Sequence, residues 1–193
     1  THLVYRSDLP LRGFDDDVRA HIAVALADRG ITLHSGSTID KVIDEGTRKQ
    51  VSLSSGVTLS VDAVMAATGR LPNTAGLGLD EVGVTCGQQG EIIVDVESRT
   101  SVFSIFAIGD VTNRINLTPV AIAEGHAFAD SEFGGDKRVA DHTNVASAVF
   151  SQPPIASVGL TEAEAKAAFG AINVFTSGFR AMKNTISGRG EKT

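Results

Sequence analysis

One short segment near the middle of the chain constrains the fold more than any other. Residues 102–108 are almost wholly apolar and β-rich, and they end in the pair Gly109-Asp110. Such a run is typical of a strand buried on both faces of a parallel sheet. A little further on, Thr118 and Pro119 open a stretch of small residues, which predicts a helix with Thr118 as its N-cap. The segment therefore predicts an α/β fold in which a strand, a turn and a helix follow one another.

The turn after this strand is a candidate ligand site. Ligands of parallel α/β sheets bind beyond the carboxyl ends of the strands, where Asp110 emerges. Gly109 lets a ligand approach the backbone closely, and the Asp110 carboxylate can accept hydrogen bonds from hydroxyls such as those of a ribityl chain. The free N–H groups at the helix start favour negative charge by roughly 0.3–1 kcal/mol. This arrangement suits a flavin; the alternative is an ordinary strand–turn–helix unit with an aspartate in its turn.

Composition excludes several classes of protein. The chain has 193 residues, of which 42% are hydrophobic, and a net charge of −6. It can bury a sizeable core, and its acidic balance argues against nucleic acid or an anionic membrane as a partner. No apolar run approaches the ~18 residues that span a bilayer, and no signal-like segment opens the chain, so we expect a cytoplasmic protein. Cys86 is the only cysteine, which rules out a disulfide within these residues.

Local patterns predict the other elements. Three consecutive aspartates, Asp15 to Asp17, start a helix that Gly30 ends. Thr161 and Glu164 form a capping box at the start of a second helix that runs to Phe169. Further strands are expected at residues 31–34, 39–43, 50–53, 57–61, 63–69, 148–150, 155–158 and 174–179. The chain begins in what reads as a strand already under way and ends without a closing element, so we expect it to be part of a longer protein.

Two arginines near the start bear on the choice of nucleotide. Arg6 closes the first strand and Arg12 follows in the next loop, where both can converge on one anion. Sites selective for NAD usually place an acidic residue there, whereas arginine accommodates a 2′-phosphate. The pair therefore favours NADP, with each contact contributing roughly 1.5–3 kcal/mol. The alternative is two solvated surface arginines.

Several segments in the same order resemble one known family. They are residues 6–15, 67–73, 105–110, 116–125, 148–155, 158–162 and 179–188. Together they resemble the glutathione reductases among the flavin-dependent pyridine nucleotide–disulfide oxidoreductases, and residues 179–188 look closest to the plant-like bacterial branch. Individual motifs are shared with lipoamide dehydrogenase and mercuric reductase. The arginine pair and the Pro153-Pro154 segment favour glutathione reductase.

The resemblance implies FAD and NADP as cofactors and assigns residues to them. Asp110 would bind the ribityl and phosphate part of FAD, and Thr118, with Leu117 beside it, would offer its amide to the flavin ring. The remaining assignments concern the pyridine nucleotide: Arg6 and Arg12 at the 2′-phosphate, Gly69 and Arg70 along the dinucleotide, and Asn116 and Ala148 at the nicotinamide end.

The resemblance also implies a division into domains. Residues 1–72 would be the second half of an NADP(H)-binding domain, 73–135 the C-terminal part of an FAD-binding domain, and 136–193 the start of an α+β dimer interface domain. The expected fold class is thus α/β with two partial nucleotide-binding domains and the beginning of an interface domain.

The implied activity belongs to a whole homodimeric enzyme that reduces glutathione disulfide. The family's Cys-x4-Cys pair and its proton-transferring histidine have no counterpart in this chain, so we expect no catalytic residue and no activity from residues 1–193 alone; no metal site is expected either. Two departures from the family weaken the substrate and nicotinamide assignments: His126 stands where some members carry a glutathione-binding arginine, and Ala146-Ser147 replaces a common Pro-Thr. The alternatives are a non-catalytic folding or dimerisation module, or part of a lipoamide dehydrogenase or mercuric reductase.

Overall fold

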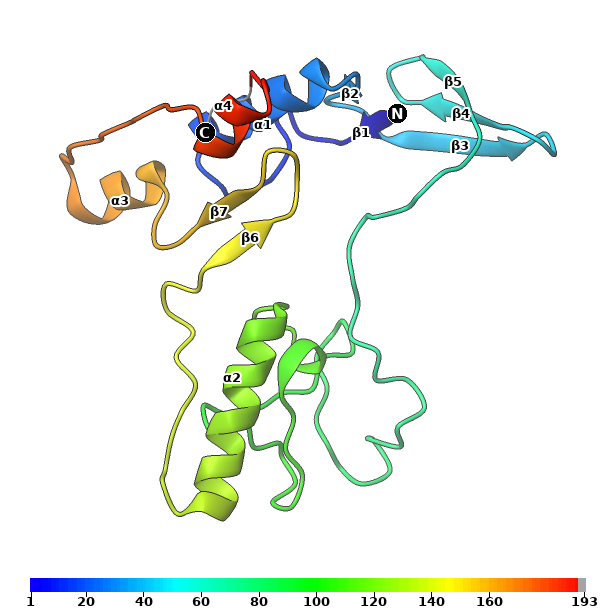
Figure 1. Cartoon of the computed structure of the whole chain (residues 1–193). Coiled ribbons are helices and arrows are strands. Elements are labelled where there is room, and N and C mark those ends of the chain that lie inside the picture. Colours follow the sequence, from blue (N-terminus) through cyan, green and yellow to red (C-terminus); the bar gives the residue numbers. More distant parts are fainter. Residues whose placement is uncertain (191–193) are drawn as a thin grey trace. The chain divides into compact units, whose positions relative to one another are not determined.

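The computed structural model describes residues 1–190 and consists of two compact units (Figure 1). The first unit joins Thr1–Ala66 to the chain from Ala146 onward, and the second is Ala67–Val145. Helices and strands are both present, as the expected α/β class requires. The units are defined by packing and not by ligands, so the assignment of residues 1–72, 73–135 and 136–193 to cofactor and interface domains stays a prediction. Within the described residues, no helix is long and apolar enough to cross a bilayer.

The first unit opens with a strand, a helix and a parallel strand. β1 (His2–Val4) pairs with β2 (Thr32–His34) in parallel, and α1 (Asp16–Asp28) connects them. Asp16 and Asp17 lie in the first turn of α1, where negative charge complements the helix dipole. Ile22, at 1% exposure, is the side chain by which α1 is anchored in the core. The predicted helix and the strand that follows it are confirmed.

A three-stranded antiparallel sheet follows in the same unit. It contains β3 (Ile39–Asp44), β4 (Lys49–Leu53) and β5 (Thr58–Val61), with β4 in the centre. Val51 and Leu53 of the central strand are buried, while β3 is exposed along its whole length. The three strands expected here are confirmed. A short turn joins each strand to the next, so antiparallel neighbours pair directly.

The returning part of the first unit holds a second antiparallel pair and two helices. β6 (Ser147–Val149) pairs with β7 (Ile155–Ser157) across the Pro153-Pro154 corner, and α3 (Glu162–Phe169) follows. The amide of Glu162 donates to Asp15 Oδ1 at 2.6 Å, which ties α3 to the loop before α1. The strand expected at residues 174–179 is absent, and the short α4 (Met182–Ile186) was not expected.

The capping box of α3 is confirmed and gives a stability prediction. The Thr161 hydroxyl accepts from the Glu164 amide at 3.3 Å, and the Glu164 carboxylate accepts from the Thr161 amide at 2.8 Å. Replacing Thr161 by alanine should lower the free energy of unfolding by about 1 kcal/mol, since the cap is lost. Urea denaturation followed by circular dichroism measures this, and Thr161→Ser is the matched control because it keeps the hydroxyl. An alanine variant as stable as the serine variant contradicts the prediction.

The same cap makes a pH dependence testable. The backbone amide of Thr161, followed by its hydroxyl, lowers the pKa of Glu164 below its ordinary value of 4.5. A carboxyl whose pKa is lowered on folding stabilises the protein above its unfolded pKa and loses this effect as pH falls through the folded value. Thr161→Ala keeps the amide and loses only the hydroxyl, so the stability difference between the wild type and this variant should be largest above pH 4.5 and become smaller, without vanishing, as pH falls below it.

The second unit is built mainly from turns around one long helix. Its regular elements are a 3₁₀ turn, η1 (Gly109–Thr112), the helix α2 (Thr118–Ala129) and a π-type turn, η2 (Asp130–Gly134). Val84, Ile92 and Ala107 form its core. The helix predicted after Thr118 is confirmed.

The two buried strands expected in and beside this unit are wrong. Residues 63–69 have no strand, and residues 102–108 have only an isolated bridge between Phe106 and Arg99. A buried strand of a parallel sheet needs neighbours that complete its hydrogen bonds. Among residues 1–190 no strand lies alongside either run. The apolar run instead packs as an irregular segment, with Ala107 buried and Val102 and Ile105 against the core.

Candidate functional site

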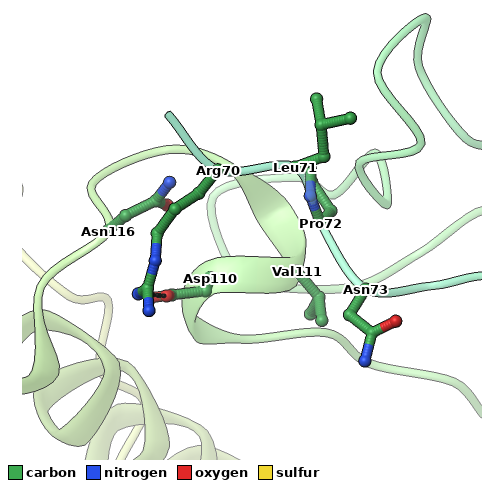
Figure 2. Close-up of a pocket in the computed structure, with 7 residues that line it drawn as sticks. All are labelled: Arg70, Leu71, Pro72, Asn73, Asp110, Val111 and Asn116. Atoms are coloured by element: carbon green, nitrogen blue, oxygen red, sulfur yellow. Dashed lines mark ion pairs between the residues drawn. The ribbon is translucent and has the colours of Figure 1, made fainter. Parts of the chain in front are cut away.

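A hollow of about 340 Å³ lies in the second unit, at the turn that follows residues 102–108. It is lined by Arg70, Leu71, Pro72, Asn73, Asp110, Val111 and Asn116. Figure 2 shows Arg70 reaching toward Asp110, with Asn116 on the neighbouring segment. Three of the residues singled out from the sequence, Arg70, Asp110 and Asn116, are therefore brought together in one place.

Asp110 presents its carboxylate to this hollow. Its side chain is 51% exposed, and its Oδ2 lies 3.5 Å from Nη1 of Arg70, whose side chain is 79% exposed. An exposed ion pair of this kind contributes little to stability. Both groups can therefore exchange this contact for a ligand that carries hydroxyls or negative charge.

The backbone before Asp110 depends on a glycine. Gly109 has a φ of 70°, in the left-handed region that side chains disfavour. A Cβ at this position would lie 3.1 Å from the Cβ of Ala121 on α2. The turn can thus pass close to the helix only because residue 109 has no side chain, a constraint imposed by α2 in addition to any ligand.

The start of α2 faces the same segment and differs from the prediction by one residue. Leu117, in extended conformation, is the N-cap, and Thr118 is the first helical residue with Pro119 after it. The helix has no side-chain cap, since the N-cap residue Leu117 carries no acceptor in its side chain. Within residues 1–190 the Thr118 amide has no hydrogen-bond partner. That amide is available to a ligand, and its contact with a flavin ring stays a prediction.

Of the remaining residues predicted to bind the pyridine nucleotide, two lie in or next to this hollow and one lies in the first unit. Gly69, with a φ of 131°, is exposed and directly precedes Arg70. Asn116 is exposed and donates from its side chain to Asn113 Oδ1 at 3.0 Å. Ala148 lies on β6 of the first unit and does not line this hollow. Its nicotinamide role stays a prediction.

A second hollow, of about 620 Å³, lies in the first unit after β1. Its lining consists of Arg6, Ser7, Asp8, Leu9, Asp16, Asp17, Arg19 and Ala20. Arg6 is thus placed in a pocket, whereas Arg12 is exposed and is not part of the lining. The convergence of both arginines on one anion stays a prediction.

Arg19, which sequence reasoning missed, braces the rim of this second hollow. Its Nε and Nη2 donate to the carbonyls of Pro10 and Leu9 at 2.9 and 2.8 Å, and its Nη1 donates to Asp16 at 2.7 Å. These contacts hold the loop that carries Arg12. The signal available in the sequence was a basic residue that directly follows the acidic first turn of a helix.

Groups in and near the first hollow fit the flavin expected from the sequence. Asp110 lines the hollow as an exposed acceptor, and the Thr118 amide, at the start of α2 in the same unit, is a free donor. A polyol chain needs acceptors and a ring that gains negative charge needs a donor. The chain therefore supplies the types of group required for the ribityl chain and the ring edge of FAD.

Comparison with known families covers nearly the whole chain. The family "Pyridine nucleotide-disulphide oxidoreductase" matches residues 1–125, and its "dimerisation domain" matches residues 145–193. The second match begins near the point where the chain returns to the first packing unit.

Individual proteins agree with these matches. A glutathione reductase from Burkholderia cepacia is 52% identical over 98% of this chain and 42% of its own length. A trypanothione reductase from Trypanosoma congolense is 48% identical over 96% of this chain and 38% of its own length. The solved structure of the HOCl-induced flavoprotein disulfide reductase RclA from Escherichia coli superposes with a TM-score of 0.87 at 27% identity, covering 97% of this chain and 43% of its own. The chain thus spans about two fifths of the length of the curated relatives it matches.

Proposed function

Because the chain belongs to the pyridine nucleotide–disulphide oxidoreductase family, we propose that it works as part of a longer NADPH-dependent flavoprotein that reduces glutathione disulfide. The family uses FAD and a pyridine nucleotide, in agreement with the cofactors expected from the sequence. The observation that carries the proposal is the hollow that Asp110 lines with an exposed carboxylate, in the same unit as the free Thr118 amide at the start of α2.

The proposed roles are those that the family resemblance implies, and the positions of Asp110 and Arg6 in the two hollows support two of them. Asp110 accepts hydrogen bonds from the ribityl chain, and the amide of Thr118, held by Leu117 at the cap, donates to the flavin ring. Arg6, which lines the second hollow, binds the 2′-phosphate of NADPH with help from Arg12. Four further residues are proposed to contact the pyridine nucleotide: Gly69 and Arg70 along the dinucleotide, and Asn116 and Ala148 at the nicotinamide end.

The chain's own residues bind and orient, and the redox chemistry comes from other groups. When bound, FAD would pass reducing equivalents from NADPH to a disulfide. Cys86, the single cysteine, is half-buried in the second unit and cannot form a cycling thiol pair alone. The thiol pair and the acid–base histidine must therefore come from outside residues 1–193, which on their own should have no reductase activity.

The choice of glutathione disulfide is supported by the relatives' names. The Burkholderia cepacia relative is a glutathione reductase, and it is more similar to this chain than the trypanothione reductase is, at 52% against 48% identity. The similarity to both leaves other bulky disulfides as outcomes of the test. His126 is exposed on α2, at a position where the family resemblance places a substrate contact in some members.

Two further proposals concern assembly and location. The match of residues 145–193 to the dimerisation domain supports a homodimer. The cytoplasmic location expected from the sequence is also a proposal, since the name of a Pisum sativum relative places that protein in chloroplasts or mitochondria.

The test uses the protein purified from its natural source. We expect an intact mass well above 20.1 kDa, a yellow flavin spectrum and oxidation of NADPH on addition of glutathione disulfide. Trypanothione disulfide and lipoamide serve as competing substrates under the same conditions. A colourless protein of 20.1 kDa overturns the proposal in favour of a non-catalytic folding or dimerisation module, and faster turnover of another disulfide overturns the choice of substrate.

A further inference from the structure

Glu124 is a buried carboxylate in the middle of α2. Its side chain is 1% exposed, and it lies between the buried apolar residues Val120 and Ala127 on the same helix. Burial of a charged group is costly unless partners surround it. Nothing in the proposed cofactor contacts uses this residue, so its burial needs another reason.

The partners of Glu124 include the backbone of the cofactor turn. Its Oε2 accepts a hydrogen bond from the amide of Gly109 at 2.5 Å. Its Oε1 lies 2.9 Å from Nη2 of Arg114 and 2.7 Å from Nε2 of His142. One carboxylate thus connects the residue before Asp110 to a cation and to the segment that follows α2.

The same network also holds the other side of Gly109. Arg114 donates to Ser98 at 3.1 Å and to the Thr112 hydroxyl at 3.3 Å. The Thr112 hydroxyl in turn donates to the carbonyl of Gly109 at 2.8 Å. Both peptide groups that flank the Cα of Gly109 are therefore fixed by side chains that meet at Glu124 and Arg114.

From this geometry we propose that Glu124 is a positioning residue, which holds the Gly109 turn so that the Asp110 carboxylate points toward FAD. The inference rests on the proposed function. Rotation of the Gly109 peptide groups would swing the next residue, Asp110, away from the hollow. An apolar residue would fill the position between Val120 and Ala127 without costly burial, but it offers no acceptor to the Gly109 amide.

The test compares Glu124→Ala and Glu124→Gln in the full-length flavoprotein that contains this chain. Glutamine keeps an oxygen that can accept from the Gly109 amide, whereas alanine removes it. We expect the dissociation constant of FAD, measured by flavin fluorescence on the apoprotein, to rise at least 10-fold in Glu124→Ala and by an intermediate factor in Glu124→Gln. The flavin absorption bands of both holoproteins should shift. Glu81→Gln, at an exposed glutamate of the same unit, is the matched control and should change neither quantity.

The outcomes separate this inference from the proposed function. A folded Glu124→Ala protein that binds FAD within twofold of the wild type overturns the inference, as does glutamine that is no better than alanine. If Glu124→Ala does not fold, the FAD dissociation constant of Glu124→Gln is compared with that of the control Glu81→Gln. A value within twofold of the control overturns the inference, and a larger loss of affinity supports it. Asp110→Ala is measured in parallel. If it weakens FAD binding while the Glu124 variants do not, only the positioning role fails; if it leaves FAD binding unchanged, the proposed site itself fails.

Discussion

Replacing Asp110 by alanine should weaken FAD binding by about 10- to 100-fold, because the variant loses hydrogen bonds to a charged acceptor that contribute roughly 1.5–3 kcal/mol. The stability of the apoprotein should change little, since the carboxylate is half-exposed and its one ion pair within residues 1–190 is the long contact with Arg70. Binding is measured by fluorescence titration of the flavin-depleted full-length protein, and stability by urea denaturation of the same sample.

Two controls decide what the loss means. Asp80→Ala removes an exposed aspartate of the same unit and should leave the affinity for FAD unchanged. Asp110→Asn keeps an acceptor oxygen without the charge and should fall between the wild type and Asp110→Ala. Equal affinity of Asp110→Ala and Asp80→Ala would remove Asp110 from the cofactor site.

The second large effect concerns the choice between NADPH and NADH. Replacing both Arg6 and Arg12 by alanine should lower the ratio of kcat/KM for NADPH over that for NADH by about 100-fold or more, since two charge-assisted contacts to the 2′-phosphate are lost. The structure also indicates which of the two arginines should contribute more. Arg6 lines the second hollow and Arg12 does not, so Arg6→Ala alone should account for most of the loss.

The loss should appear only with the phosphorylated nucleotide. KM for NADH should stay the same or fall, because the arginines contact a group that NADH lacks. Lys41→Ala removes one positive charge from the exposed face of β3 and controls for the general change in charge. Unchanged use of NADPH by the double variant would favour an NADH-dependent relative and make the two arginines solvated surface residues.

Elements that carry their own local signals were predictable from the sequence. α1 has acidic residues at its start and Gly30 after its end, α3 has a capping box, and β3 to β5 are joined by tight turns. Residues 63–69, 102–108 and 174–179 have the composition of strands, but among residues 1–190 none of them forms a ladder with a neighbouring strand. Composition indicates that a segment can be a strand, whereas a ladder depends on a second segment that composition does not reveal.

The site was predictable to the extent that it depends on motifs. The resemblance assigned Asp110 to FAD and Arg70 and Asn116 to the pyridine nucleotide, whereas the structure brings all three into one hollow. Glu124 was missed because a single acidic residue on a helix is normally solvated, and its burial depends on Arg114 and His142 far from it in the sequence. The signal that was available is its position as a lone charge in an otherwise apolar and small-residue helix.

The close approach of Gly109 to Ala121 has a consequence for how sequences of this family can diverge. The two positions share one small volume, since even a methyl group on residue 109 would meet the methyl group of residue 121 at 3.1 Å. Enlarging residue 121 would press on the turn just as enlarging residue 109 would press on the helix. Natural substitutions at these positions should therefore be correlated, and a bulkier residue at 121 should occur only where the helix has moved outward.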